Sequence, residues 1–557
     1  MATDSASNLS DAGREHQSYL DAIGIRTSLG SFYTPFHMVE RILRISFDDL
    51  GISRFVGSRK AFTVLDPTCG TGNFLLLAAL FISDKLLPEF PSKEDSLDWV
   101  VLNCIYGLDI DALAIEETIK NLSALTENRV GSDQIRPHFH VGNVMFISEH
   151  ADLFSEQGDT WETIFPEIFS GTEWGFDAIF GNPPFLNPLK KETAIDEFTA
   201  NQVKENLGDA SQALTNTATL ILQISRTLVK RASGFVAIVQ PISIVATRDS
   251  ADARREIDEG EYLSAVWICE DKVFDAAVQT CVLFISTKPQ PEVRIYSGAQ
   301  GTYGSTVPKS RELGNWSKYV YSARGLPDLN FKSTGVLGEL AHSSNDFRDE
   351  YYGLVGAIIS KEDADDLQSP KLITVGKIDL ANLSWGHEPT KFAKEAYEFP
   401  RVEISRLEPK MLSWATRMAR PKILVATQTK IVELFVDDTG ILLPSIPIAS
   451  VFPNEGIDIW KVAACLASPL VTLYSLSQLA GAGMNAEVLK ISARFIITIP
   501  LPSKNEEWAQ GARFLELAQS ASGENKRELL TEFGKVMGAA YQVDEPEKIL
   551  EWWSARL

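Results

Sequence analysis

The sequence predicts an α/β protein in which a mostly parallel sheet is covered by helices and is followed by a second domain of mixed α+β structure. Between residues 62 and 285, short β-branched apolar runs alternate with longer helical patterns, and this alternation is typical of a parallel α/β sheet. After Lys288 and Pro289 the chain becomes rich in Gly, Ser, Asn and Tyr, with scattered strands. We therefore expect a first domain over residues 1–290 and a second over residues 291–557.

Each expected element follows from a local pattern. Short apolar runs predict buried strands at AFTVLD (61–66), IYGLDI (105–110), FDAIFG (176–181), GFVAIVQ (234–240) and TCVLFIS (280–286). Residues 215–231 repeat apolar side chains at helical spacing, which predicts a helix with one face packed inward. In the second domain, strands are predicted at KILVAT (422–427) and ELFVDD (433–438), and amphipathic helices over residues 506–557.

The composition excludes several classes of protein. Hydrophobic residues make up 45% and charged residues 23% of the 557 residues, which is ordinary for a globular protein and unlike a disordered one. The longest apolar run, Phe74 to Ile82, is less than half of the roughly 20 residues that cross a bilayer. The N-terminus lacks a secretory signal, so a cytoplasmic location is expected. Five cysteines without a C-x-x-C pair favour reduced thiols, and no metal is implied.

The charge distribution has one local exception. A net charge of −22 points away from nucleic acid as a partner, because phosphate-binding proteins usually carry a basic surface. Residues 401–430, however, hold seven basic residues against two acidic ones. This segment is either a solvated face or a DNA-facing patch, and Arg417, Arg420 and Lys422 are its candidate DNA-binding residues.

A glycine-rich loop follows the first predicted strand. Asp66 ends that strand, and Gly70 and Gly72 in PTCGTGNF allow a tight turn and close approach to a ligand. A third glycine, which a dinucleotide fingerprint requires, is missing, and this favours a cofactor with an amino acid tail. Asp109 ends the next strand and is placed to accept hydrogen bonds from two ribose hydroxyls. We attribute the long interval between the loop and Asp109 to an insertion around residues 87–98.

A third motif decides between functions. Asn182, Pro183, Pro184 and Phe185 come directly after a buried strand, where open α/β sheets bind ligands. The structural alternative is a rigid turn, because Asn and Pro are turn formers. The order of a glycine loop, an acidic strand end and then N-P-P-F favours a functional site.

These motifs resemble those of the gamma-class N6-adenine DNA methyltransferases of restriction-modification systems. The segments that carry the resemblance are SFYTPFHMVERIL (31–43), DPTCGTGNF (66–74), GLDIDALAIE (107–116), GNPPF (181–185) and KVFDAAVQTCVLFI (272–285). The resemblance spans residues 29–290 and extends more faintly into residues 420–430 and 483–502, which look like parts of a target-recognition domain.

The resemblance implies a class I Rossmann-like methyltransferase sheet and S-adenosylmethionine as the cofactor. It assigns Thr34, with Asp66, Thr68 and Gly70, to the methionine end of the cofactor. Asp109 is assigned to the ribose and Ile110 to the adenine ring, and Tyr33 and Gly72 complete the cofactor set. The family usually has Asp where this chain has Asn143, whose amide oxygen can still accept a hydrogen bond from the cofactor's adenine amino group.

The chemistry of N-P-P-F has a physical basis. An adenine amino group is a poor nucleophile, since its lone pair is delocalised into the ring. Acceptors on the Asn182 side chain and the Pro183 carbonyl would draw that group toward tetrahedral geometry. Phe185 offers a face on which the adenine can stack, and the resemblance implies that Phe274 holds the other side of the base. The structural alternative for Phe274 is a place in the hydrophobic core. Such a pocket requires a base extruded from the duplex.

Several alternatives stay open at this point. RNA adenine methyltransferases share N-P-P-F and protein glutamine methyltransferases share N-P-P, but both usually lack a large C-terminal domain. A catalytically silent DNA-binding subunit is the alternative of a different class. The expected partners are double-stranded DNA, read by the second domain, and a separate cognate restriction endonuclease. We find no nuclease pattern in this sequence and expect methylation alone.

Overall fold

The chain divides into two compact units, Met1–Arg324 and Gly325–Leu557, and each is described by itself. The computed structural model describes residues 34–57, 60–147, 159–170, 173–185, 216–245, 247, 250–260, 262–269, 279–309, 313–327, 329–345, 348–362, 369–479 and 488–557.

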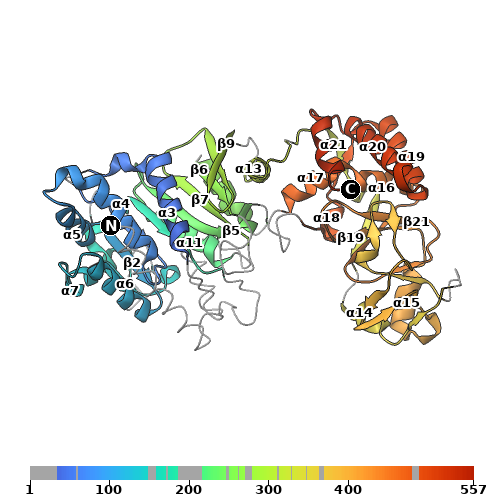
Figure 1. The fold of residues 1–557 in the computed structure, drawn as a ribbon, viewed down its shortest axis with the longest axis horizontal. Helices are drawn as coiled ribbons and strands as arrows, with labels where there is room; N and C mark the ends of the chain where they lie inside the picture. Colours follow the sequence, from blue (N-terminus) through green and yellow to red (C-terminus); the bar gives the residue numbers. More distant parts are fainter. Residues whose placement is uncertain are drawn as a thin grey trace, which may run out of the picture. The chain divides into compact units, whose positions relative to one another are not determined.

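The first unit is built on a nine-stranded sheet with the strand order β3-β2-β1-β4-β5-β7-β6-β8-β9 (Figure 1). Its strands are β1 Val64–Asp66, β2 Ile105–Asp109, β3 Phe139–Val141, β4 Ala178–Gly181, β5 Phe235–Pro241, β6 Leu263–Ile268, β7 Thr280–Ser286, β8 Glu292–Ser297 and β9 Thr302–Pro308. The five strands from β3 to β5 are parallel, whereas β7 runs antiparallel to both β5 and β6. The predicted α/β sheet is confirmed, and its second half is mixed rather than parallel.

The described part of the first unit also contains α-helices, several of which pack on the sheet. They are α3 Phe36–Arg44, α4 Asn73–Leu86, α5 Lys93–Asn103, α6 Ala112–Leu125, α7 Ser132–Ile135, α8 Trp161–Ile164, α9 Pro166–Phe169, α11 Thr217–Thr227, α12 Ala251–Glu259 and α13 Ser317–Ala323. On one face, Val64, Ile105 and Phe180 share a core with buried side chains of α3 and α4. The predicted helix over 215–231 corresponds to α11, which lies against β5, where Gln240 Nε2 donates to the Ala218 carbonyl at 2.8 Å.

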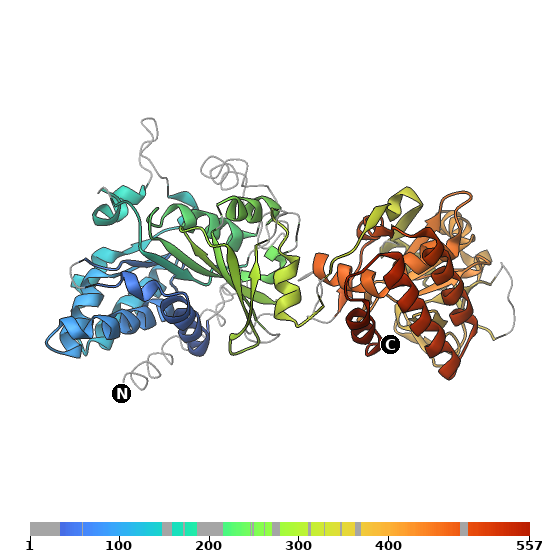
Figure 2. The same ribbon diagram turned by 90° about the horizontal axis from the view of Figure 1, so that it is seen from above.

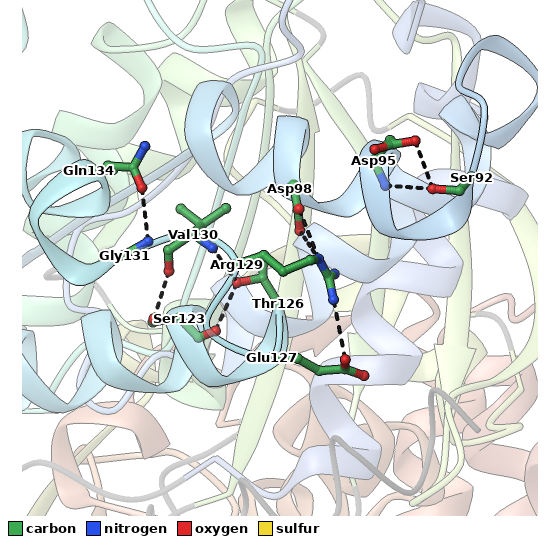
Figure 3. Close-up of polar contacts among 10 residues, drawn as sticks. All are labelled: Ser92, Asp95, Asp98, Ser123, Thr126, Glu127, Arg129, Val130, Gly131 and Gln134. Carbon is green, nitrogen blue, oxygen red and sulfur yellow. Dashed lines mark hydrogen bonds and ion pairs between the residues drawn. The ribbon is translucent and has the colours of Figure 1, made fainter.

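The long interval between the glycine loop and Asp109 contains helix α5, which overlaps the insertion predicted around residues 87–98 (Figure 3). Ser92 caps its first turn by accepting a hydrogen bond from the Asp95 N–H at 3.0 Å. Asp98 on the same helix binds Arg129 Nε through both carboxylate oxygens, at 3.1 and 2.9 Å. Arg129 lies shortly after α6, so this ion pair joins α5 to the segment that follows α6.

The boundary between the two units differs from the predicted one. We expected it near residue 290, but β8 pairs with β6 and β9 pairs with β8, so the sheet continues to Pro308. Helix α13 packs against both added strands, and the unit ends at Arg324. The change of composition at Lys288 and Pro289 therefore marks a turn between strands of one sheet, because a local turn signal carries no information about which strands pair.

The second unit contains two four-stranded sheets, with the orders β11-β23-β19-β21 and β12-β18-β13-β22. The strands are β10 Ser333–Val336, β11 Ala341–Asn345, β12 Ile358–Ser360, β13 Lys371–Ile373, β14 Ile378–Asp379, β15 Asn382–Leu383, β16 Thr390–Phe392, β17 Glu395–Tyr397, β18 Pro400–Val402, β19 Lys422–Ala426, β20 Gln428–Thr429, β21 Leu434–Asp437, β22 Leu442–Pro444, β23 Ile448–Pro453, β24 Leu489–Lys490 and β25 Pro500–Pro502. The predicted strands KILVAT and ELFVDD correspond to β19 and β21.

Helices complete two cores in this second unit. They are α14 Arg348–Leu354, α15 Pro409–Met418, α16 Ile459–Ala467, α17 Pro469–Gln478, α18 Ala493–Ile496, α19 Asn505–Ser520, α20 Gly523–Ala540 and α21 Pro546–Ser554. Helices α14 and α15 form a small core with the β12-β18-β13-β22 sheet. Helices α19 and α20 lie side by side (Figure 2). They share the larger core with α16, α17 and the β11-β23-β19-β21 sheet. The predicted C-terminal helices are confirmed as α19 to α21.

No single helix in the described ranges combines the length and apolar composition needed to cross a membrane. In these ranges only the pair α16 and α17, taken together, has that length and composition, and the pair is bent by 59° at its break.

Candidate active site

The glycine loop lies between β1 and α4 and is tied to the neighbouring strand β2. Gly70 and Gly72 have φ values of +53° and +89°, a backbone region in which side chains are strained. A Cβ atom on Gly72 would lie 2.7 Å from Thr118 Cγ2. The Gly70 N–H donates to Asp109 Oδ2 at 2.8 Å, so the loop and the strand-end carboxylate that the sequence singled out separately form one unit.

Helix α6 holds the other side of this loop. Thr118 Oγ1 donates to the Gly70 carbonyl at 2.7 Å, and Asn121 Nδ2 donates to the Thr71 carbonyl at 3.2 Å. Sequence reasoning did not find these two residues, because they lie on a helix whose pattern indicates only packing. Two polar residues three apart on the helix after Asp109 would have been the available signal.

Asp66 is buried at the carboxyl end of β1, with 2% of its surface exposed. Its Oδ1 accepts a hydrogen bond from the Thr68 N–H at 3.0 Å. A Cβ atom on Gly181 would lie 2.9 Å from the same oxygen, so the glycine before Asn182 leaves room for this carboxyl group. Burial raises the pKa of Asp66, and the nearby charge of Asp109 raises this pKa further. A cationic ligand beside Asp66 would counter both effects by favouring the carboxylate.

Exposed apolar side chains surround Asp109. Ile110, Leu113 and Val141 are 56%, 57% and 47% exposed, and Val141 lies beside Asp109 in the β2–β3 register. The Asp109 carboxylate also accepts from the Asp111 N–H at 2.9 Å, through Oδ1. Apolar surface next to a carboxylate is the chemistry that an aromatic ring joined to a ribose requires. The residues present therefore fit the adenosine end of the expected cofactor.

Asn143 lies next to this surface. The preceding Gly142 N–H donates to the Asp109 carbonyl at 2.9 Å. The Asn143 side-chain oxygen accepts from the Met145 N–H at 3.1 Å and caps a short 3₁₀ helix, Val144–Phe146. The structure thus brings Asn143 to the expected edge of the sheet, with one of the two lone pairs of its oxygen used by the backbone.

Asn182 follows β4 and is held by Thr34 from the segment before α3. Asn182 Nδ2 donates to Thr34 Oγ1 at 2.9 Å. The Asn182 side-chain oxygen is buried and has no hydrogen-bond partner among the residues that the structure describes. Phe185 is half-buried and packs against the core of the first unit. One acceptor at the carboxyl end of β4 is therefore left without a protein donor.

The structure gathers most of the expected site at one edge of the sheet, because β1, β2 and β4 are parallel neighbours and their carboxyl ends meet there. Tyr33 and Phe274 lie outside the described residues. No group of three or more His, Cys, Asp or Glu in the described part of the chain is arranged to hold a metal ion.

Comparison with known proteins identifies the family. The model of the N-6 DNA methylase family matches residues 22–300, which cover half of the chain and include the glycine loop, Asp109, Asn143 and N-P-P-F. The chain belongs to the N-6 DNA methylase family. This membership agrees with the resemblance to the gamma-class enzymes.

Individual relatives of this methylase are distant. The type II restriction enzyme and methyltransferase RM.Eco57I of Escherichia coli is 23% identical over 296 residues, which are 47% of this chain and 28% of that protein. This chain thus matches less than a third of that curated relative. The type IIL restriction-modification enzyme MmeI, solved in complex with DNA, superposes with a TM-score of 0.56 at 11% identity, covering 94% of this chain and 76% of that one. The likeness to MmeI shows a shared fold that includes the second unit.

The basic segment of this methylase, residues 401–430, does not form one surface. Arg417 and Arg420 are exposed, and the Arg420 guanidinium lies 4.0 Å from the Phe452 ring centroid. Lys422, the third candidate, differs from these two. It is fully buried on β19, and its Nζ lies 2.5 Å from Asp437 Oδ2. Its assignment as a DNA-binding residue is wrong, because a buried, paired ammonium cannot reach a phosphate.

Arg401, from the same segment, is also buried. It is 1% exposed and donates to the carbonyls of Lys361 and Ser369 at 2.8 and 2.9 Å. The local excess of positive charge is therefore partly a property of the core, since burial depends on tertiary packing that a count of charges does not reveal.

Proposed function

We propose that this methylase transfers a methyl group from S-adenosylmethionine to N6 of an adenine that is extruded from double-stranded DNA. The observation that carries the proposal is the buried Asn182 side-chain oxygen, which has no partner among the described residues. Buried acceptors in folded proteins are nearly always satisfied. An acceptor left open at the ligand-binding edge of an α/β sheet is therefore explained by a donor on a substrate.

The residues around the glycine loop would hold the cofactor. Asp66, Thr68 and Gly70 lie where the methionine end would bind, Asp109 would accept from the ribose hydroxyls, and the exposed side chain of Ile110 would pack on the adenine ring. When bound, S-adenosylmethionine supplies an electrophilic methyl group. The task left to the protein is to orient the target amino group.

Asn182 and Pro183 would perform that task. The Asn182 oxygen accepts one hydrogen of the target amino group and the Pro183 carbonyl accepts the other, which turns the nitrogen lone pair away from the ring and toward the methyl group. Phe185, half-buried against the core, stacks on the flipped base, a contact worth roughly 1 to 3 kcal/mol. No covalent intermediate is needed, and the proton leaves through the acceptors to solvent.

DNA is favoured over RNA or protein as the substrate by the second unit. The fold of MmeI, which was solved in complex with DNA, covers 94% of this chain, whereas a small-substrate methyltransferase would need only the first unit. The second unit would read the target sequence. A separate cognate endonuclease is the partner that a restriction-modification setting implies.

The test is the variant Asn182→Ala, which removes the open acceptor and leaves the glycine loop and Asp109 in place. We expect about a hundredfold or greater loss of the single-turnover rate, as on deletion of one preorganised polar group elsewhere, with cofactor and DNA affinity near wild type. The assay follows labelled methyl groups into unmethylated plasmid DNA, and mass spectrometry of the nucleosides identifies the modified base.

The matched control is Asn103→Ala at the opposite edge of the sheet, where Asn103 Nδ2 bonds to the Trp99 carbonyl at 2.7 Å. This control should keep the wild-type rate. A wild-type rate for Asn182→Ala, or label that enters RNA or protein but never DNA adenine, would refute the proposed function.

A further inference from the structure

Thr34 is bonded on two sides, and the two bonds join separate motifs. Its hydroxyl oxygen accepts from Asn182 Nδ2 at 2.9 Å. Its carbonyl oxygen accepts from Asn73 Nδ2 at 3.0 Å, and Asn73 is the first residue of α4, directly after the glycine loop. Thr34 is 8% exposed. This residue therefore links the loop expected to bind the cofactor to the side chain expected to act on the substrate.

The two ends of an asparagine amide are similar in size but opposite in hydrogen bonding. A rotation of the Asn182 amide by half a turn would exchange its oxygen for its NH₂ group. The NH₂ group would then face the substrate amino group, placing donor against donor. The orientation of this amide thus decides whether Asn182 attracts or repels the target. The Thr34 hydroxyl can accept from the NH₂ group or donate to the oxygen, so its bond fixes the place of the side chain, and the donor on the target favours the orientation observed, with Nδ2 on Thr34.

We propose that Thr34 is a positioning residue that holds the Asn182 side chain in place at the end of β4, so that its oxygen stays available to the substrate. The inference rests on the proposed function of Asn182. Threonine suits this role because its β-branch restricts χ1, and because Asn73 fixes its backbone through the second bond. The hydroxyl accepts from Nδ2, so the side-chain oxygen is left as the open acceptor.

The role is distinct from the contact with the methionine end of the cofactor that the family resemblance gives Thr34. A cofactor contact predicts weaker cofactor binding, whereas amide positioning predicts a slower methyl transfer even when the cofactor is saturating. The two effects are separated by measuring cofactor affinity by calorimetry and the single-turnover rate at saturating cofactor and DNA.

The experiment compares Thr34→Val, which removes the hydroxyl and keeps the β-branch, with Thr34→Ser, which keeps the hydroxyl. Each is made in the wild type and in Asn182→Ala. We expect Thr34→Val to lower the saturated rate about tenfold, since one net hydrogen bond is lost. Thr34→Ser should stay within about twofold of wild type. In the Asn182→Ala background, Thr34→Val should cause no further loss, because no amide remains for Thr34 to hold.

Two results would overturn the inference. One is a loss of equal size in both backgrounds, and the other is an unchanged saturated rate for Thr34→Val while Asn182→Ala is slow. If Asn182→Ala itself keeps the wild-type rate, the proposed function fails instead, and the two failures are thereby told apart. Thermal unfolding of each variant, with Thr34→Ala as a second hydroxyl-free variant, ensures that rates are compared between folded proteins.

Discussion

The two ends of strand β4 differ in how their polar side chains are satisfied. Asp177, at the amino end, accepts hydrogen bonds at Oδ2 from the Thr63 N–H at 2.9 Å, from Thr63 Oγ1 at 3.1 Å and from Lys230 Nζ at 2.6 Å. Asn182, at the carboxyl end, has a buried side-chain oxygen without a partner among the described residues. Both belong to the single segment FDAIFGNPPF.

The difference suggests separate roles for the two residues: Asp177 supports the fold, and Asn182 has the proposed role in substrate binding. A buried charge that accepts several hydrogen bonds contributes to folding, and its removal leaves those donors unsatisfied. A buried acceptor without a partner lowers stability by about 1 to 3 kcal/mol, and such a cost is typical of a site that awaits a ligand. The open acceptor, together with its place at the carboxyl end of β4, supports the proposed role of Asn182.

The largest expected effect is on stability, at the amino end. Asp177→Ala leaves Lys230 unpaired in a site where the two side chains are 11% and 12% exposed, so we expect the first unit to lose about 3 to 5 kcal/mol of unfolding free energy. Urea denaturation measures this loss. The single-turnover rate of the folded protein should not change.

The control for Asp177 is Glu40→Ala, which breaks an exposed ion pair with Arg44 and should alter stability by less than about 1 kcal/mol. A slower methyl transfer in Asp177→Ala without a loss of stability would contradict the division between the two ends of β4.

Asp109 is an intermediate case and sharpens the comparison. Both of its carboxylate oxygens accept backbone N–H groups, from Gly70 at 2.8 Å and from Asp111 at 2.9 Å, yet apolar side chains around it are exposed. We expect Asp109→Ala to weaken S-adenosylmethionine binding by about 1.5 to 3 kcal/mol, because the ribose loses its charged acceptor. Calorimetry tests this, and Asp109→Asn should weaken binding less. Unchanged affinity in Asp109→Ala would remove Asp109 from the cofactor site.

The residues that the sequence predicted well are those fixed by local backbone chemistry. Gly70 and Gly72 have the positive φ values that their place after a strand suggested. Asp66, Asp109 and Asn182 each end or follow a strand, and parallel pairing alone brings such positions to one edge. Motif order along the chain therefore predicted that these positions lie together, and their roles in binding and catalysis stay predictions.

The residues that the sequence missed or misplaced depend on tertiary contacts. Thr118 and Asn121 support the glycine loop from a helix whose sequence pattern indicates only packing. Lys422 was counted as a surface charge, but its partner Asp437 lies on the neighbouring strand β21. Likewise, the domain boundary moved from 290 to 324 because strand pairing continued past a turn. Pairing between distant segments has no local signature in one sequence.

The smallest expected effect concerns the part of the basic segment that remains exposed. Among the described residues, Arg417 donates to Ser413 of its own helix at 3.1 Å, and Arg420 lies against Phe452. Both side chains are exposed, so both guanidinium groups are able to meet phosphates. If each arginine makes one phosphate contact, the double variant Arg417→Ala/Arg420→Ala should lower the magnitude of the slope of log K against log salt concentration by about 0.9 per contact. Cofactor affinity should not change.

Two further variants decide what this result means. Arg513→Ala removes an exposed arginine from α19 of the same unit and should leave the salt slope unchanged if the contact is local to the basic segment. Lys422→Ala removes the buried partner of Asp437, so it should lower the unfolding free energy of the second unit, and any folded protein should bind DNA with the wild-type slope. A reduced salt slope for folded Lys422→Ala would show that Lys422 contacts DNA in spite of its burial. If the double arginine variant keeps both affinity and slope, the segment is a solvated face, and DNA must be bound by other residues of the chain.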